Sequence, residues 1–113
     1  MSVSHVTTHV LDTGSGRPAA GIAVTLHRLD AGRWVQIATG STDADGRVKS
    51  LGPEHLPSGM YRMGFDTASY FAATNTEAFF PEVTLTFAVD EEQAHYHVPL
   101  LLSPFAYSTY RGS

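Results

Sequence analysis

The chain has 113 residues and a mass of 12.2 kDa, which suits one domain over residues 1–113 with a single hydrophobic core. Hydrophobic residues make up 42% of the sequence and charged residues 16%, a balance typical of a globular chain and not of a disordered one. The formal net charge of −4 argues against nucleic acid or an anionic membrane as a partner, and the absence of cysteine excludes disulfides, thiol catalysis and cysteine-bound metals.

The first half of the chain alternates apolar and polar residues in short segments, separated by turns rich in glycine, proline and aspartate. This period of two is typical of β-strands. The first segment places Val6, Thr8 and Val10 on one face, which is the expected core side. The strands predicted in this half cover about residues 4–12, 22–29, 33–40 and 47–49.

The second half continues this pattern except in one segment. Residues 67–74 contain alanines and neither glycine nor proline, and they predict one short helix. Strands are predicted on both sides of it, at about 61–65, 83–89, 94–102 and 106–111. Regular short strands between turns indicate an all-β sandwich or barrel.

Targeting and membrane segments are not expected. The first ten residues have neither the basic start nor the apolar stretch of a signal peptide. Away from the start, the longest apolar run is Val98–Leu102, far shorter than the roughly 18 residues that span a bilayer. The sequence therefore predicts a cytoplasmic protein with no membrane partner.

Two predicted strands carry histidine on the side opposite their apolar residues. His9 lies opposite the face of Val6 and Val10, while His95 and His97 lie opposite the apolar residues of their own strand. An isolated histidine in such a place is usually exposed to solvent. That interpretation is kept for the remaining histidines, His5, His27 and His55.

The pair His95 and His97 has a second interpretation, since residues two apart on a strand point the same way and can share a metal ion. His9 would supply a third ligand if the first strand lay alongside. Two histidines alone are not a metal site, so surface histidines and a zinc site both stay open here.

Asp43–Gly46 resembles the start of a calcium loop, but Val48 occupies the position that needs glycine, so we interpret the segment as a turn. Arg47 follows it and, like Arg17 and Arg62, is expected to be an exposed arginine. No serine-hydrolase elbow, phosphate loop or dinucleotide motif is present. The residues alone therefore indicate an all-β sandwich with a possible histidine–arginine polar site.

Three stretches together carry a family resemblance. They are Thr8–Thr13 with Gly16–Ala19, then Thr42–Arg47, and then His97–Pro104 with the terminal Tyr110–Ser113. Together they resemble the transthyretin-like 5-hydroxyisourate hydrolases over essentially the whole chain. The terminal Tyr-Arg-Gly-Ser is the most specific element, because transthyretin itself lacks it.

The resemblance implies a two-sheet sandwich of about eight strands with one short helix, assembled as a homotetramer with active sites in a channel between dimers. It implies catalytic roles for His9, Arg47, His97 and Ser113, and contacts from His9, Arg47 and Tyr110 to the substrate. Zinc lies near these histidines in some members, but the resemblance implies hydrolysis without a cofactor or a metal.

The implied reaction is the hydrolysis of 5-hydroxyisourate to 2-oxo-4-hydroxy-4-carboxy-5-ureidoimidazoline in urate degradation. A histidine, with a free pKa of about 6.5, suits deprotonation of the attacking water, and an arginine suits the developing oxyanion. The sequence leaves open which histidine is the base. The alternative function is a non-catalytic carrier of transthyretin type, which would hold a small aromatic ligand in the channel.

Overall fold

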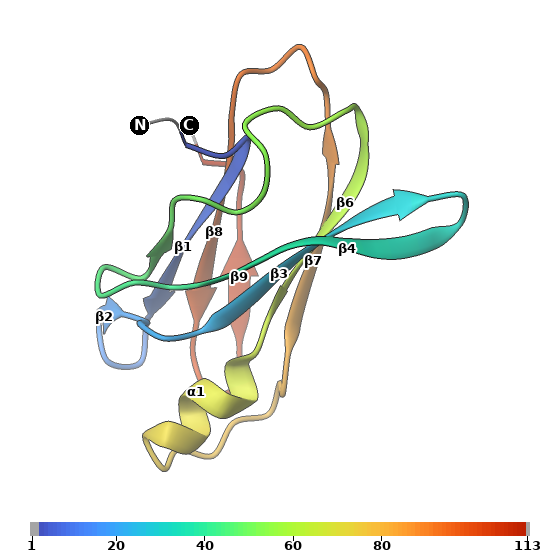
Figure 1. Ribbon diagram of the computed structural model, residues 1–113. Coiled ribbons are helices and arrows are strands. Elements are labelled where there is room, and N and C mark those ends of the chain that lie inside the picture. Colours follow the sequence, from blue (N-terminus) through green and yellow to red (C-terminus); the bar gives the residue numbers. More distant parts are fainter. Residues whose placement is uncertain (1–2, 113) are drawn as a thin grey trace.

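The computed structural model describes residues 3–112, in which two β-sheets pack face to face and a short helix lies at one end (Figure 1). The all-β sandwich with one short helix is thereby confirmed for this part of the chain. Its elements are β1 (Val6–Asp12), β2 (Arg17–Pro18), β3 (Ala23–Asp30), β4 (Arg33–Ser41), β5 (Arg47–Val48), β6 (Gly59–Phe65), α1 (Thr67–Ala73), β7 (Val83–Val89), β8 (Tyr96–Leu102) and β9 (Tyr107–Thr109).

The two sheets differ in how their strands are connected. One has the order β2-β1-β8-β9, with β5 also paired to β1, and the other has the order β4-β3-β6-β7. β1 and β8 run parallel, with Val6 opposite Tyr96 at one end and Asp12 opposite Leu102 at the other. Parallel strands need a long connection, and here all of the other sheet lies between them in the sequence. This pairing brings the two histidine-bearing strands side by side.

The core lies between the inner faces of the sheets, as the alternation predicts. On β1, Val6 and Val10 are fully buried. β8 contributes four buried residues, and the other sheet supplies most of the rest. These further core residues are Tyr96, Val98, Leu100, Leu102, Ile22, Val24, Leu26, Tyr61, Met63, Phe65, Val83, Leu85 and Val89. The alternate residues of β1 and β8 therefore lie on the opposite, outer face of the five-stranded sheet.

Helix α1 is held at its start by a side-chain cap. The Asp66 carboxylate accepts the backbone N–H of Ser69 at 3.2 Å and the Ser69 hydroxyl at 2.7 Å. Phe71 is buried and anchors the helix to the sandwich. The predicted helix is confirmed to within one residue. In the described part of the chain, no helix is long and apolar enough to cross a membrane.

Most predicted strands are observed with boundaries shifted by one or two residues, and two larger points differ from the prediction. β2 was not predicted, because two residues are too short to show alternation; it pairs with the end of β1. β9 ends at Thr109 and not at residue 111, and a single bridge between Gly112 and His97 continues its line. The end of the chain therefore stays beside β8 without forming a regular strand.

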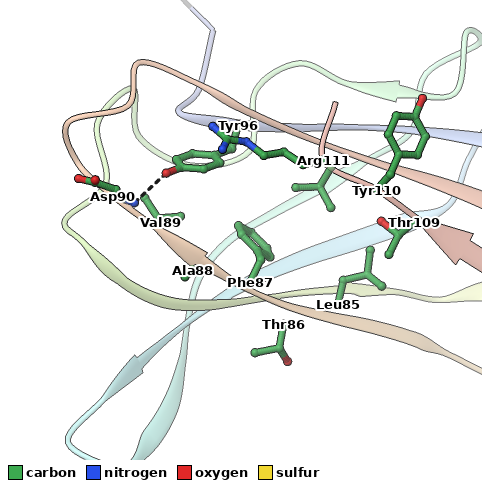
Figure 2. Close-up of a pocket in the computed structure, with 11 residues that line it drawn as sticks. Leu85, Thr86, Phe87, Ala88, Val89, Asp90, Tyr96, Thr109, Tyr110 and Arg111 are labelled. Atoms are coloured by element: carbon green, nitrogen blue, oxygen red, sulfur yellow. Dashed lines mark hydrogen bonds between the residues drawn. The ribbon is translucent and has the colours of Figure 1, made fainter. Parts of the chain in front are cut away.

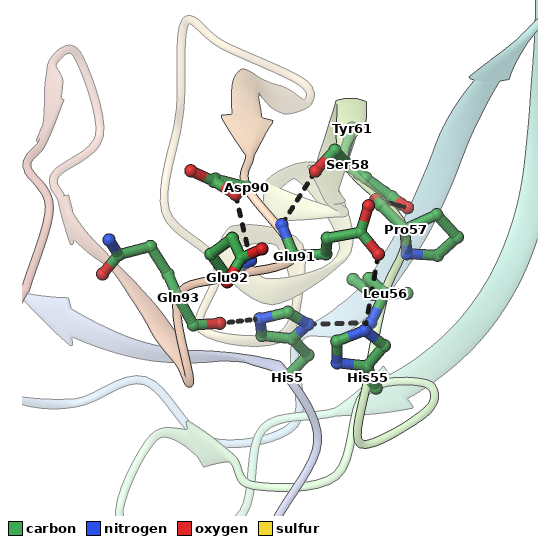
Figure 3. A network of polar contacts seen from close by, with 10 residues as sticks. All are labelled: His5, His55, Leu56, Pro57, Ser58, Tyr61, Asp90, Glu91, Glu92 and Gln93. Carbon is green, nitrogen blue, oxygen red and sulfur yellow. Dashed lines mark hydrogen bonds and ion pairs between the residues drawn. The ribbon is translucent and has the colours of Figure 1, made fainter.

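His5 is buried, so its expected exposure is wrong (Figure 3). Its side chain is 1% exposed, because the loops before β6 and before β8 close over the start of β1. The Leu56 N–H donates to Nδ1 at 2.7 Å, and Nε2 donates to the Gln93 carbonyl at 2.7 Å. Because Nδ1 accepts, the ring is neutral and carries its proton on Nε2.

His55 stacks on this ring at 5.5 Å between centroids and is confirmed as exposed, at 66% for its side chain, where it faces Glu91 at 3.8 Å. His27 is half-buried and not exposed. Arg62 is also half-buried, since its guanidinium covers the Trp34 ring at 4.0 Å, whereas Arg17 is exposed as expected.

Replacement of His5 by alanine should lower the free energy of unfolding by about 3 kcal/mol, because it opens a cavity and leaves the buried Leu56 N–H and the partly buried Gln93 carbonyl without their partner. Denaturant unfolding at neutral pH and fixed protein concentration measures this. His55→Ala is the control and should change stability by less than about 0.5 kcal/mol, as expected for an exposed side chain. Equal stability of the two variants would contradict a stabilising role for the bonds of His5 to these two loops.

Candidate active site

Three strands of one sheet bring the predicted polar residues to a common face. His9 on β1 is the register partner of Arg47 on β5, and Thr7 on β1 is the partner of His97 on β8. Register partners project to the same side of a sheet, as do Thr7 and His9 two residues apart. Adjacent strands are about 4.8 Å apart, so these four side chains are neighbours on the outer face of the five-stranded sheet.

This face contains an open hollow of about 280 Å³ beside β8. Its lining includes Arg47, Lys49, His95 and His97, together with Thr7 at its floor. Arg47 is exposed and His97 half-buried, so both can be reached from solvent. Two fixed cations and two imidazoles suit a small ligand rich in carbonyl oxygens or bearing negative charge.

The Thr7 hydroxyl contacts two histidines at once. Its Oγ1 lies 2.9 Å from His97 Nδ1 and 3.0 Å from His95 Nε2. Thr7 itself is buried, which limits the directions open to its hydroxyl. His97 is therefore held through Nδ1, and Nε2 is the ring nitrogen left for a ligand.

The surroundings of His97 favour its neutral form. Burial lowers the pKa of His97 below its ordinary 6.5, and the positive charge of Arg47 lowers it further, followed by smaller contributions from His95 and His9. An imidazole that stays unprotonated at neutral pH is able to accept a proton from water. Arg47 lines the same hollow as His97, and His9 is the register partner of Arg47.

Residues 110–112 run alongside β8. The Gly112 N–H donates to the His97 carbonyl at 2.8 Å, in the same antiparallel register that pairs Thr109 with Leu100. That register sets Tyr110, which is 59% exposed, opposite Pro99, the β8 partner of His9. The tail (residues 110–112) thus completes a row across the sheet with His9 and Arg47.

A second hollow, of about 470 Å³, lies on the other side of β8, between β7 and the tail (Figure 2). It is lined mainly by apolar side chains such as Leu85 and Phe87, and the Arg111 guanidinium lies over the Tyr96 ring at 4.6 Å. Tyr96 alternates with His95 and His97 along the chain and so faces away from these two histidines. The apolar hollow therefore lacks the imidazoles, and the His97 face is the better candidate for chemistry.

Comparison with known proteins shows the family. The model of the HIUase/Transthyretin family matches residues 6–112. The chain belongs to this family.

Individual relatives cover nearly all of the chain. It is 47% identical over 106 residues to a 5-hydroxyisourate hydrolase of Salmonella dublin, covering 93% of this chain and 78% of the relative. The structure of Klebsiella pneumoniae 5-hydroxyisourate hydrolase matches with a TM-score of 0.84 and 35% identity, covering 97% of this chain and 100% of that one. Sea bream transthyretin in complex with thyroxine matches with a TM-score of 0.91 and 37% identity, covering 96% and 94%.

The structure brings together three of the residues expected in the site, His9, Arg47 and His97, and sets Tyr110 in line with them. Ser113 lies outside the described residues. The metal interpretation gains no support, since within residues 3–112 no three histidine or acidic side chains form a group that could hold an ion. Thr7 was missed, although its position two residues before His9 on the same face is a signal that the sequence does contain.

Replacing Arg47 by glutamine should raise the pKa of His97, because it removes a cation that disfavours the imidazolium form. The pKa should remain below 6.5, since burial is the largest cause of the shift and persists in the variant. An NMR titration of the His97 ring measures both values. Arg17→Gln is the charge-matched control and should leave the titration unchanged; an identical titration in Arg47→Gln would contradict the role of Arg47.

Proposed function

We propose that this chain is a 5-hydroxyisourate hydrolase whose reaction is carried by His97 and Arg47. It adds water to a ring lactam of 5-hydroxyisourate and gives 2-oxo-4-hydroxy-4-carboxy-5-ureidoimidazoline. The observation that carries the proposal is a half-buried imidazole, its pKa lowered by burial and by Arg47, beside that exposed guanidinium in an open hollow. The hydrolases among its relatives, which match almost the whole chain, support the same reaction.

The proposed steps follow from these two groups. His97 Nε2 takes a proton from water as the water oxygen bonds to the lactam carbon. The Arg47 guanidinium stabilises the developing oxyanion with N–H donors. The carbon–nitrogen bond then breaks, and the proton held by His97 passes to the leaving nitrogen. The carbonyl carbon becomes a carboxylic acid, which ionises by releasing its remaining proton to solvent. No covalent intermediate with the protein forms in this scheme.

The remaining predicted residues are assigned to binding and to completing the site. His9 lies beside Arg47, and Tyr110 offers a flat ring and a hydroxyl in the same row, so both suit contacts with a planar ring substrate. Ser113 is included in the proposed site as the terminal residue of the same tail. No metal or cofactor takes part in the proposed reaction.

The alternative of a transthyretin-type carrier is less well supported. Overall fold does not distinguish the two functions, because the transthyretin and hydrolase structures both match closely. The residues of the proposed channel wall distinguish the two functions. His9, Arg47 and His97 are poorly suited to an apolar aromatic ligand and well suited to proton transfer. A carrier would need none of these groups.

We also propose a homotetramer in which the outer face of the five-stranded sheet is a wall between subunits. Half-buried Leu11 and Leu101 and exposed Tyr110 lie on this face, and an isolated chain would leave them in water. Light scattering at micromolar concentration should give four times the 12.2 kDa chain mass. A monomer would contradict the channel between dimers.

A spectrophotometric assay of freshly generated 5-hydroxyisourate tests the function. The absorbance should decay far faster with the protein than in buffer, and as fast after treatment with EDTA. A decay equal to that in buffer would overturn the hydrolase proposal. Loss of activity in EDTA that zinc restores would overturn the metal-free scheme.

A further inference from the structure

The contact of Thr7 with two imidazoles restricts where their protons lie. A hydroxyl has one hydrogen to donate and two lone pairs to accept with. Thr7 Oγ1 is within hydrogen-bond distance of both His97 Nδ1 and His95 Nε2, so it can donate to one ring only. The other ring must then donate its own N–H to Thr7.

Two arrangements of protons satisfy all three groups when both rings are neutral. In one, Thr7 donates to His97 Nδ1, and the His97 proton lies on Nε2. In the other, His97 donates Nδ1–H to Thr7, and Thr7 donates to His95 Nε2. Only the second arrangement leaves a lone pair on His97 Nε2, the nitrogen that would take a proton from water.

We propose that Thr7 is a positioning residue for His97, holding the ring with its proton on Nδ1 and its basic Nε2 toward the hollow, with His95 as the acceptor that makes this arrangement possible. The inference rests on the proposed hydrolase function. It adds a residue whose proposed role is exerted through His97 and not through a reacting atom of the substrate.

The geometry supports this role in two further respects. Thr7 is buried on β1 directly opposite His97, so its hydroxyl is fixed by the parallel register and not by a mobile loop. His97 also keeps the same bond to Thr7 when Nε2 gains a proton, because Nδ1–H is already the donor. The ring therefore does not have to turn during proton transfer, which limits reorganisation in the reaction.

Thr7→Val and Thr7→Ser test the inference, since valine keeps the shape and loses the hydroxyl, while serine keeps the hydroxyl. Thr7→Val should lower kcat about ten-fold or more and change KM less than about three-fold, as for other losses of a group that orients a catalytic ligand or base. Nitrogen NMR of the His97 ring should show a lower population protonated at Nδ1. Thr7→Ser should recover most of kcat and the wild-type NMR pattern.

Thr67→Val is the matched control, because it removes another buried threonine hydroxyl, which belongs to helix α1 and donates to the Phe80 carbonyl, outside the proposed site. It should leave kcat and the His97 spectrum unchanged. Thr7→Ala replaces Thr7→Val if the valine variant does not fold.

Three outcomes would overturn the positioning role: kcat within two-fold of wild type in Thr7→Val, equal losses in the valine and serine variants, or an unchanged His97 tautomer. These results are separate from failure of the proposed function. Wild-type turnover in His97→Ala would overturn the proposed role of His97 as the base, whatever effect Thr7 has on the tautomer of the His97 ring.

Discussion

Turnover should fall by roughly 100-fold or more when His97, Arg47 or His9 is replaced by alanine, the scale typical of a lost general base or oxyanion partner. His97→Ala removes the proposed base, and Arg47→Ala removes the proposed oxyanion donor. Arg47→Lys should stay poorly active, because lysine keeps the charge but loses the planar pair of donors. Steady-state kinetics of purified variants measure these losses.

Stability should change little in the same variants. Arg47 is exposed, and His9 and His97 are half-buried on the outer face of the sheet, so their removal opens no cavity in the core. His27→Ala is the control, since His27 belongs to the other sheet, where it pairs with Gln36 and Arg62. It should keep wild-type turnover. Full activity in Arg47→Ala would contradict the proposed role of Arg47 at the oxyanion. Full activity in both His9→Ala and His97→Ala would contradict the proposal that this face is catalytic.

Double variants should lose less activity than the product of the two single fold-losses, because the residues act together in one reaction step.

The pH dependence of the reaction gives a separate check on His97. Its lowered pKa keeps the base unprotonated until the pH falls below 6.5, so kcat/KM should rise with pH along a limb whose midpoint lies below that value. A midpoint above 6.5 would contradict His97 as the base.

Alternation along the strands made much of the fold predictable. The faces of β1 and β8 followed from their period of two, and the core side of each is buried as expected. Helix α1 was predicted from composition alone. The parallel pairing of β1 with β8 was not predictable from residues, because it depends on how the other sheet, which lies between them in sequence, folds back over the core.

The candidate site was predictable to the extent that it lies on strands. His9, Arg47 and His97 came from motifs, and their common face depends on a register that only the structure gives. The burial of His5 was not predictable from its own strand. Its alternation placed it on the outer face, but loops far away in the sequence close over that end of β1.

Removing residues 110–113 should abolish most of the activity and leave folding largely intact. β9 pairs with β8 through Tyr107, Ser108 and Thr109, and the truncation keeps these residues. It removes the backbone bond from Gly112 to His97 and the cover of Arg111 over Tyr96. Circular dichroism and thermal unfolding separate the two effects: an insoluble truncated chain would make the tail structural, and a fully active one would leave it without a role.

Gly112→Ala tests the same region with a single added methyl group. A Cβ at residue 112 would lie 2.7 Å from His97 Cδ2, closer than real Cβ contacts, so the imidazole would have to move. The strain falls on the His97 ring and not on the backbone, since Gly112 has no positive φ. We expect kcat to fall about ten-fold or more, as when a misplaced group disturbs reacting geometry, with little change in Tm. Ser108→Ala, at an exposed position of β9, should keep wild-type kcat. If Gly112→Ala also keeps it, the position of the His97 ring does not limit turnover, and the effect of the truncation would then belong to Tyr110, Arg111 or Ser113.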